Sequence, residues 1–179
     1  QGVEILKGSS QIKYGPFTTG GAINLISTQI PTEFSGRVNL IGGSYGGTNL
    51  HAFAGNSHKN IAYLVEGFQY GSLGFKQIDG GGKTGFDKRD YLAKFRVNTN
   101  PEAKTYQSLT FKIGKATETS HETYLGLTED DFQHDPYRRY AGSQKDLMET
   151  EQSQLSATHF INLSRSFHIT TTVYRNDFS

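Results

Sequence analysis

The sequence predicts an all-β chain that folds as an antiparallel succession of long strands. Helical periodicity is almost absent from the 179 residues, and an alternation of apolar and polar side chains takes its place. Glycine, asparagine, aspartate and proline interrupt the alternation at intervals that suit turns. Several alternating segments exceed the roughly five or six residues of a globular strand. Such lengths favour strands that cross a bilayer at a slant, for which about ten residues suffice.

Eight strands follow from the alternation and from the turn residues between them. We expect them at about 22–29, 34–44, 47–57, 60–74, 88–99, 105–117, 152–163 and 166–178. The two faces are clearest in the fifth of these, where Tyr91 and Phe95 lie opposite Lys94 and Arg96. The strand around 61–70 has apolar residues on both faces, so its orientation stays open. Alternation alone also fits a soluble β-sandwich.

The connections distinguish the two ends of the predicted sheet. Three are short, with the sequences HKN, NPEAK and SRS, whereas the segments at about 75–89 and 118–151 are long. Because short and long connections alternate, an antiparallel sheet collects the short ones at one end and the long ones at the other. Bacterial outer-membrane β-barrels have this asymmetry. The short GGSYGG connection, on the side where a long loop is expected, is an exception.

A short helix is expected inside the longest loop, in GLTEDDFQHDP. Thr128 suits the N-cap, the acidic residues 129–131 suit the first turn, and Pro136 ends the helix. A connection of this length is uncommon in a compact domain and usually has a function.

Composition excludes several classes of protein. The chain has 18 basic and 17 acidic residues, so no overall charge attracts nucleic acid. It has no cysteine, which excludes disulfides and thiolate metal sites. No stretch approaches the ~18 apolar residues of a membrane-spanning helix. The chain begins at Gln1 without a methionine, and we expect it to be a processed or truncated piece.

No group of residues has the spacing of a catalytic or metal site. The segment DGGGKTG (79–85) contains the Gly-Lys-Thr of a phosphate-binding loop, but Gln77 stands where that motif needs a glycine. His121 is followed by Leu125 at the position where a zinc-protease motif needs a second histidine. The carboxylates at 129–135 lack the spacing of a calcium loop. We therefore expect neither an enzyme nor a bound metal or cofactor.

One segment suits an anionic ligand. DPYRRYAG (135–142) places two adjacent arginines between tyrosines inside the longest loop. Guanidinium groups offer forked donors to carboxylate or phosphate, and tyrosines add a hydroxyl and a flat surface. The candidate ligand contacts are Arg138, Arg139 and Tyr140. Alternatively, the arginines pair with nearby acidic residues and only hold the loop together.

The start of the chain, VEILKGSSQIKYGPFTTGGAINLISTQIP (3–31), is rich in glycine. A strand ends in Lys-Gly, and Tyr-Gly, Gly-Gly and an apolar INLIS strand follow. This order resembles the last part of the plug domain of TonB-dependent outer-membrane receptors. The matching residues are Glu4, Lys7, Gly8, Tyr14, Gly15, Gly20, Gly21, Ile23, Asn24 and Ile26. Glycine permits positive φ and close backbone approach, which a plug folded tightly inside a barrel requires.

The resemblance implies a fold and a division of the chain. Residues 1–32 would be the C-terminal part of an internal plug domain. Residues 33–179 would be about the first seven strands of a 22-stranded, antiparallel transmembrane β-barrel. Pro31 fits the hinge between them, because proline cannot donate to a sheet ladder.

The resemblance also implies a function and partners. YGPFTTGGAINLISTQIP and GLTEDDFQHDPYRRY are most similar to the ferric dicitrate receptor branch. The implied activity is uptake of a ferric chelate, either ferric citrate or a siderophore, across the outer membrane of a Gram-negative bacterium. The partners would be the chelate, membrane lipid and the TonB–ExbB–ExbD complex. The alternatives are TonB-dependent uptake of a glycan or another organic nutrient, and a soluble β-sandwich binding module.

Overall fold

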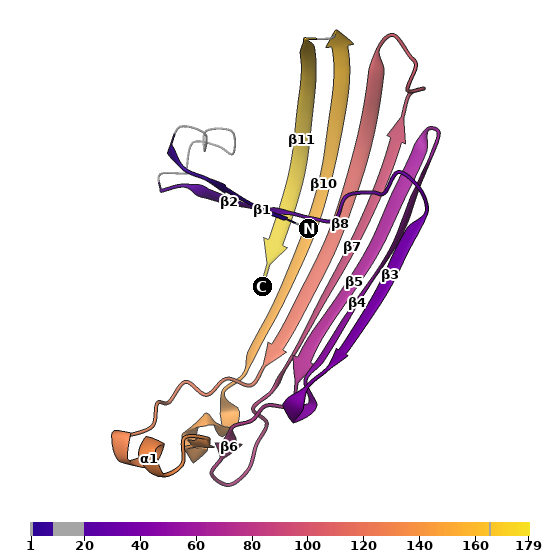
Figure 1. The fold of residues 1–179 in the computed structure, drawn as a ribbon. Helices are drawn as coiled ribbons and strands as arrows, with labels where there is room; N and C mark the ends of the chain where they lie inside the picture. Colours follow the sequence, from indigo (N-terminus) through magenta and orange to yellow (C-terminus); the bar gives the residue numbers. More distant parts are fainter. Residues whose placement is uncertain (1, 9–19, 165) are drawn as a thin grey trace. The chain divides into compact units, whose positions relative to one another are not determined.

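The computed structural model describes residues 2–8, 20–164 and 166–179, and it confirms the all-β prediction (Figure 1). The chain divides into two compact units, Gln1–Ile30 and Pro31–Ser179. The first unit contains two short strands, and the second contains a seven-stranded antiparallel sheet with long connections.

The first unit is an antiparallel pair of β1 (Gly2–Leu6) and β2 (Ala22–Ile26). Asn24 lies opposite Glu4 in this pair, and its side-chain amide donates to Oε2 of Glu4 at 3.2 Å. Gly21 has a φ of 135°, and a Cβ at this position would lie 3.0 Å from the carbonyl oxygen of Leu6. Glycine permits this positive φ and close backbone approach at Gly21, whereas Gly20, for which the motif predicts the same freedom, shows neither feature.

The other motif residues fall into two groups. Lys7, Gly8 and Gly20 belong to the described residues, and Gly8 has a φ of 68°. Tyr14 and Gly15 lie outside the described residues.

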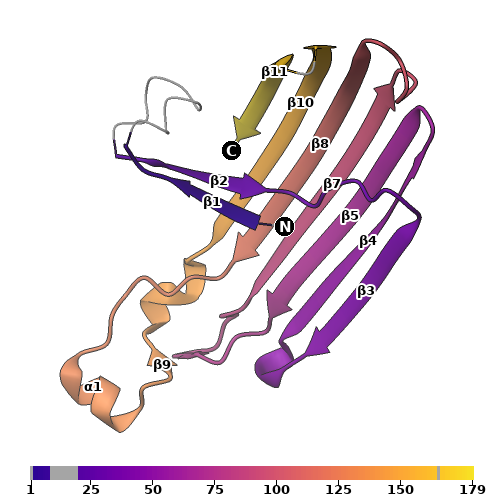
Figure 2. The same cartoon turned by 45° about the horizontal axis from the view of Figure 1, so that its top comes forward.

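The second unit is built on a sheet with the strand order β11-β10-β8-β7-β5-β4-β3, every pair antiparallel. Its strands are β3 (Ser35–Gly42), β4 (Thr48–His58), β5 (Ile61–Ser72), β7 (Phe86–Asn98), β8 (Tyr106–Ser120), β10 (Met148–Ser164) and β11 (Phe167–Phe178). Each strand pairs with its neighbour in the chain, apart from the two-residue strands in the loops, as Figure 2 shows.

The strand ends differ from the expected ones mainly where β8 meets β10. The sequence at 148–151 is polar and suggested a loop, yet β10 begins at Met148 and β8 continues to Ser120. Met148 pairs with Ser120 and the ladder is unbroken from there. Backbone pairing with a neighbouring strand satisfies the peptide groups whatever the polarity of the side chains.

The connections separate as expected between the two ends of the sheet (Figure 1). The short turns include 59–60 and 99–105, and the connections at 73–85 and 121–147 lie at the opposite end. The latter connections contain β6 (Gln77–Ile78), α1 (Glu129–His134), β9 (Arg138–Arg139) and the 3₁₀ helix η3 (Ala141–Lys145). The 3₁₀ turn η2 (Ser44–Gly46) lies at this long-loop end too, and its Tyr45 adopts a φ of 57°.

The beginning of the second unit is fixed to the sheet near the short turns. Ser57 Oγ donates to the carbonyl oxygen of Pro31 at 2.7 Å. A Cβ on Gly55 would lie 2.7 Å from Cδ of the Pro31 ring, so only glycine fits beneath it. Pro31 thus packs beside β4 without taking part in the ladder, as a proline at this boundary should.

Candidate functional site

The two faces of the seven-stranded sheet differ in chemistry, and the register assigns every strand to them. One face, which we call the apolar face, carries a band across all seven strands. Its large members are Val38, Leu40, Leu50, Tyr63, Val65, Tyr91, Phe95, Phe111, Ile113, Leu155, Ile169 and Val173. Val65 is 52% exposed and Phe95 is 44% exposed. An exposed apolar surface of this extent marks contact with another apolar phase or partner.

Toward the long loops, the apolar band ends in a row of ion pairs. Lys115 Nζ lies 3.0 Å from Glu151 Oε1 on neighbouring strands. On β7, Arg89 Nη2 lies 2.7 Å from Asp87 Oδ2, and a similar pair, Arg175–Asp177, occurs at 2.8 Å on β11. The apolar band is therefore bounded by charge at the end that carries the long connections.

The opposite face, which we call the polar face, carries charged and hydroxyl side chains together with aromatic rings such as Phe53 and Phe68. His51 Nε2 lies 2.7 Å from Glu66 Oε1 between β4 and β5. Lys94 and Lys112 are directly opposite each other on β7 and β8. Farther along the sheet, the hydroxyls of Thr158 and Thr172 are 3.1 Å apart. This face can line a water-filled space, whereas the apolar face cannot.

The strand β5, whose orientation the sequence left open, belongs to the same two-faced pattern. Ala62 and Leu64 lie on the polar face and have no exposed surface. Ile61 and Val65 lie on the apolar face and are exposed. In the register, Leu64 sits between Gly55 of β4 and Lys94 of β7. Leu64 is thus a buried apolar side chain within the polar face.

At the long-loop end, two connections that are distant in sequence are joined by backbone pairing. β6 runs parallel to β9, with Gln77 opposite Arg138 and Ile78 opposite Arg139. Asp79 N donates to the carbonyl oxygen of Arg139 at 2.8 Å. The loops 73–85 and 121–147 therefore form one assembly.

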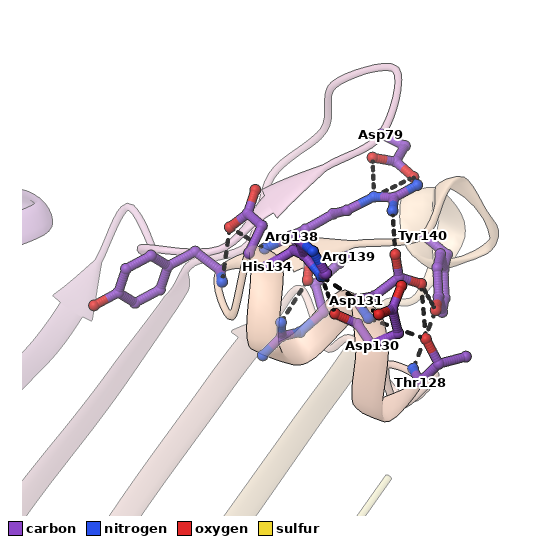
Figure 3. Close-up of polar contacts among 10 residues, drawn as sticks. Asp79, Thr128, Asp130, Asp131, His134, Arg138, Arg139 and Tyr140 are labelled. Carbon is purple, nitrogen blue, oxygen red and sulfur yellow. Dashed lines mark hydrogen bonds and ion pairs between the residues drawn. The ribbon is translucent and has the colours of Figure 1, made fainter.

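Arg138 ties this assembly together through two carboxylates (Figure 3). Its Nε and Nη2 donate to Asp79 at 2.9–3.2 Å, and its Nη1 donates to Asp131 Oδ1 at 2.7 Å. The guanidinium carbon also lies 5.4 Å from the centre of the Tyr140 ring. The hydrogen bonds that Arg138 donates to Asp79 raise the pKa of Arg138 above its ordinary value. Arg138 therefore stays charged, with its forked donors occupied within the protein.

Asp131 receives further hydrogen bonds on its second oxygen. Tyr140 Oη donates to Oδ2 of Asp131, and Thr128 Oγ1 donates to the same oxygen at 3.0 Å. Thr128 also accepts from the Asp131 backbone amide, so it caps α1 as the sequence predicts. The hydrogen bonds from Tyr140 and Thr128, followed by the Arg138 charge, lower the pKa of the Asp131 carboxyl. We call Asp79, Asp131, Arg138 and Tyr140 the loop clasp.

A hollow of about 260 Å³ lies beside the clasp, between the same two loops. Its lining includes two cations, Lys76 and Arg139. Lys76 Nζ donates to Thr123 Oγ1 at 2.7 Å. Arg139 Nη1 donates to the carbonyl oxygens of Pro136 and Arg138. The hollow therefore places two cationic groups at a concave surface.

The three predicted ligand contacts thus occupy different positions. Arg138 and Tyr140 are bonded into the clasp, which is the arrangement that the loop-holding alternative describes. Arg139, by contrast, lines the hollow. Sequence reasoning missed Lys76, because it comes from the other loop and no local pattern connects it to Arg139. Whether these residues contact a ligand stays a prediction.

Within the described ranges, no three His, Asp or Glu side chains are grouped so that they could hold a metal ion. None of the helices in that part of the chain has the length and apolar character to span a bilayer. No family model, curated protein or solved structure matches the chain.

Proposed function

We propose that this chain is a segment of a TonB-dependent outer-membrane receptor that takes up a ferric chelate into the periplasm. Pro31–Ser179 supplies part of the wall of a transmembrane β-barrel. Gln1–Ile30 supplies the end of the plug inside it. In this proposal the long-loop end faces the outside of the cell, and the short turns face the periplasm.

The two-faced sheet is the observation that carries the proposal. Its apolar face leaves large side chains such as Phe95 and Val65 exposed across seven strands, while the other face carries charged side chains beside its aromatic rings. Lipid on one face and a polar lumen on the other account for both features. The soluble sandwich fits poorly, because the large hydrophobic side chains that a second sheet should bury remain exposed. The buried hydrophobic residues among those described are Ala62, Leu64 and Ile78.

The edges of the sheet support a larger barrel. β3 and β11 each have one neighbour in the sheet, so each carries a row of unpaired peptide groups. In lipid each unsatisfied peptide group costs several kcal/mol. The sum of these costs over two edges exceeds the net stability of a folded protein, which is roughly 5–15 kcal/mol. Additional strands must therefore complete this wall if it lies in a membrane.

Iron-dependent growth tests the function directly. A strain that carries the intact gene should grow with ferric citrate as its sole iron source, and deletion of the gene should abolish this growth and the uptake of radioiron. Restoring the gene on a plasmid should restore both. Equal growth with and without the gene would contradict uptake of this chelate.

A second candidate, uptake of a glycan, is favoured by the aromatic side chains at the long-loop end. Phe75 contacts both Tyr45 and Tyr137, with ring centres 5.8 Å apart in each pair. All three side chains are partly exposed. Flat aromatic surfaces suit the apolar faces of sugars as well as other ligands. Loss of growth on a glycan, with unchanged growth on ferric citrate, would favour this candidate.

A further inference from the structure

We propose that the Asp79–Gly80 step is a site of isoaspartate formation, and that the loop clasp keeps this site from reacting. The inference goes beyond the proposed function, because it depends on the chemistry of the loops and holds whatever the protein transports. Asp79–Gly80 is the only Asp-Gly or Asn-Gly step among the 179 residues. Aspartate isomerises fastest before glycine, because glycine has no side chain to hinder attack by its own amide nitrogen.

The reaction rearranges the backbone without a change of mass. The Gly80 amide nitrogen attacks Cγ of the protonated Asp79 carboxyl group, and the carboxyl hydroxyl leaves with the amide proton as water. The product is a five-membered succinimide ring. Water then adds to one of its two carbonyl carbons and opens it. Opening at the former main-chain carbonyl gives isoaspartate, whereas opening at the other carbonyl restores aspartate.

Three sets of hydrogen bonds restrain Asp79 against this attack. Its carboxylate accepts from Nε and Nη2 of Arg138 at 2.9–3.2 Å, so turning the side chain toward the Gly80 nitrogen breaks these bonds (Figure 3). Its amide nitrogen donates to the Arg139 carbonyl oxygen at 2.8 Å. Its carbonyl oxygen accepts from Gln144 Nε2 at 3.1 Å. The clasp must therefore open before the ring can close.

The fold opposes the simplest way of removing this reactivity, which is a bulkier residue after Asp79. Gly80 has a φ of 82°, a conformation that glycine adopts without strain and that other residues rarely adopt. The Asp79 side chain is 38% exposed, so water reaches the site to open a succinimide. Protection therefore depends on the clasp.

Isomerisation prevents the clasp from closing again. In isoaspartate the free carboxylate is attached directly to Cα, so the side chain is one carbon shorter than that of Asp79. The main chain is one carbon longer, because it now runs through Cβ and Cγ. The forked contact with Arg138 is lost, and the added atom displaces the turn that follows β6. Time spent with the loops open is thus recorded as a permanently loosened pair of loops.

Ageing of the purified, intact protein in detergent at physiological temperature and neutral pH tests the proposal. After denaturation, trypsin releases residues 77–83 as one peptide. Its isoaspartate form separates by chromatography at unchanged mass and is identified by electron-transfer fragmentation. Arg138→Gln should accumulate this form several-fold faster than the wild type, since the rate follows the population of open loops. Arg138→Lys keeps the charge without the fork and should give an intermediate rate.

Arg139→Gln is the matched control, because it changes the adjacent arginine, whose guanidinium donates to carbonyl oxygens. This control should age like the wild type. Equal rates in the wild type and Arg138→Gln, or an equal increase in the control, would overturn the protective role of the clasp. No isoaspartate in Arg138→Gln would overturn the assignment of the reactive site.

Two further measurements use only the wild type, so they do not depend on the folding of a variant. The protein unfolded in urea should isomerise several-fold faster than the folded protein, and equal rates would contradict protection by the fold. Isomerised protein, separated and returned to detergent, should be cleaved by protease faster than fresh protein within 73–85 and 121–147. Cleavage at the rate of fresh protein would show that the clasp still closes.

Discussion

The two ends of the seven-stranded sheet are held together in different ways. At the short-turn end, the bonds join residues of adjacent strands in the ladder: Asn98 N donates to the Asn60 carbonyl at 2.9 Å, and the Asn60 side chain donates back to the Asn98 carbonyl at 2.8 Å. At the long-loop end, Arg138 reaches Asp79 across 59 residues. The first arrangement closes a ladder, while the second joins two loops through charge.

This difference indicates where the molecule can change its specificity. Substitutions in the long loops alter the clasp or the hollow without affecting the ladder of β5, β7 and β8, because these side chains lie beyond the strand ends. Loops on a rigid scaffold generally carry binding function for this reason.

We expect the largest change in stability from a charge introduced midway between the two ends of the sheet, where the strands should cross lipid. Phe111 lies on the apolar face between Phe95 and Ala157, and Thr110, its neighbour on β8, lies on the polar face. Phe111→Lys should lower the free energy of unfolding in lipid vesicles by about 2–4 kcal/mol, because it places a charge in the middle of the apolar band. Thr110→Lys should change it by less than about 1 kcal/mol. Urea titration followed by circular dichroism measures both, and equal effects would contradict the assignment of faces.

The second prediction breaks the clasp and leaves the short-turn end unchanged. Arg138→Gln removes the cation between Asp79 and Asp131, so the two loops should separate and be cleaved several-fold faster by a protease. Arg175→Gln is the control, because it removes an arginine that pairs within its own strand. Cleavage sites identified by mass spectrometry should lie within 73–85 and 121–147. Unchanged cleavage of these loops would show that the clasp does not hold them.

The third prediction concerns pH. The pKa of Asp131 is lowered below its model-compound value of 3.8, so the folded loops bind fewer protons than the unfolded loops near this pH. The contribution of Asp131 is therefore fully present above pH 3.8 and is lost as the pH falls through the folded pKa. The protection factors for amide exchange at 128–140, which correct for the intrinsic pH dependence of exchange, should be constant at neutral pH and fall only in strong acid. Asp131→Asn should remove this dependence, and protection factors that already fall at pH 6 would contradict it.

The smallest effect is local to α1. Thr128→Ala removes the N-cap and should cost about 1 kcal/mol of local stability, which speeds amide exchange in Glu129–His134. Thr128→Ser retains the capping hydroxyl and should exchange like the wild type. Comparable acceleration in both variants would contradict the capping role.

The sequence predicted the strands well, because alternation and turn residues are local signals. It also predicted α1, since Thr128, the acidic first turn and Pro136 lie together in the chain. It missed the two-residue strands β6 and β9, because such short strands show no periodicity. Their pairing depends on two loops meeting in space.

The loop assembly was predictable only in part. The adjacent arginines pointed to acidic partners, and Asp131 is near them in sequence. Asp79 and Lys76 lie in another connection, so their contacts with Arg138 and the hollow emerge only from the fold. The opposite roles of Arg138 and Arg139 follow from strand alternation in β9, which sends successive side chains to opposite sides.

The environment of successive residues on β7 tests the central claim most directly. Single cysteines at Tyr91, Phe95, Lys94 and Arg96 can be spin-labelled in a receptor reconstituted into lipid vesicles, because these 179 residues contribute no other cysteine. Labels at 91 and 95 should be accessible to oxygen dissolved in lipid, and labels at 94 and 96 to a water-soluble nickel complex. The same accessibility at all four positions, or labels at 91 and 95 shielded from both reagents, would contradict a sheet that has lipid on its apolar face.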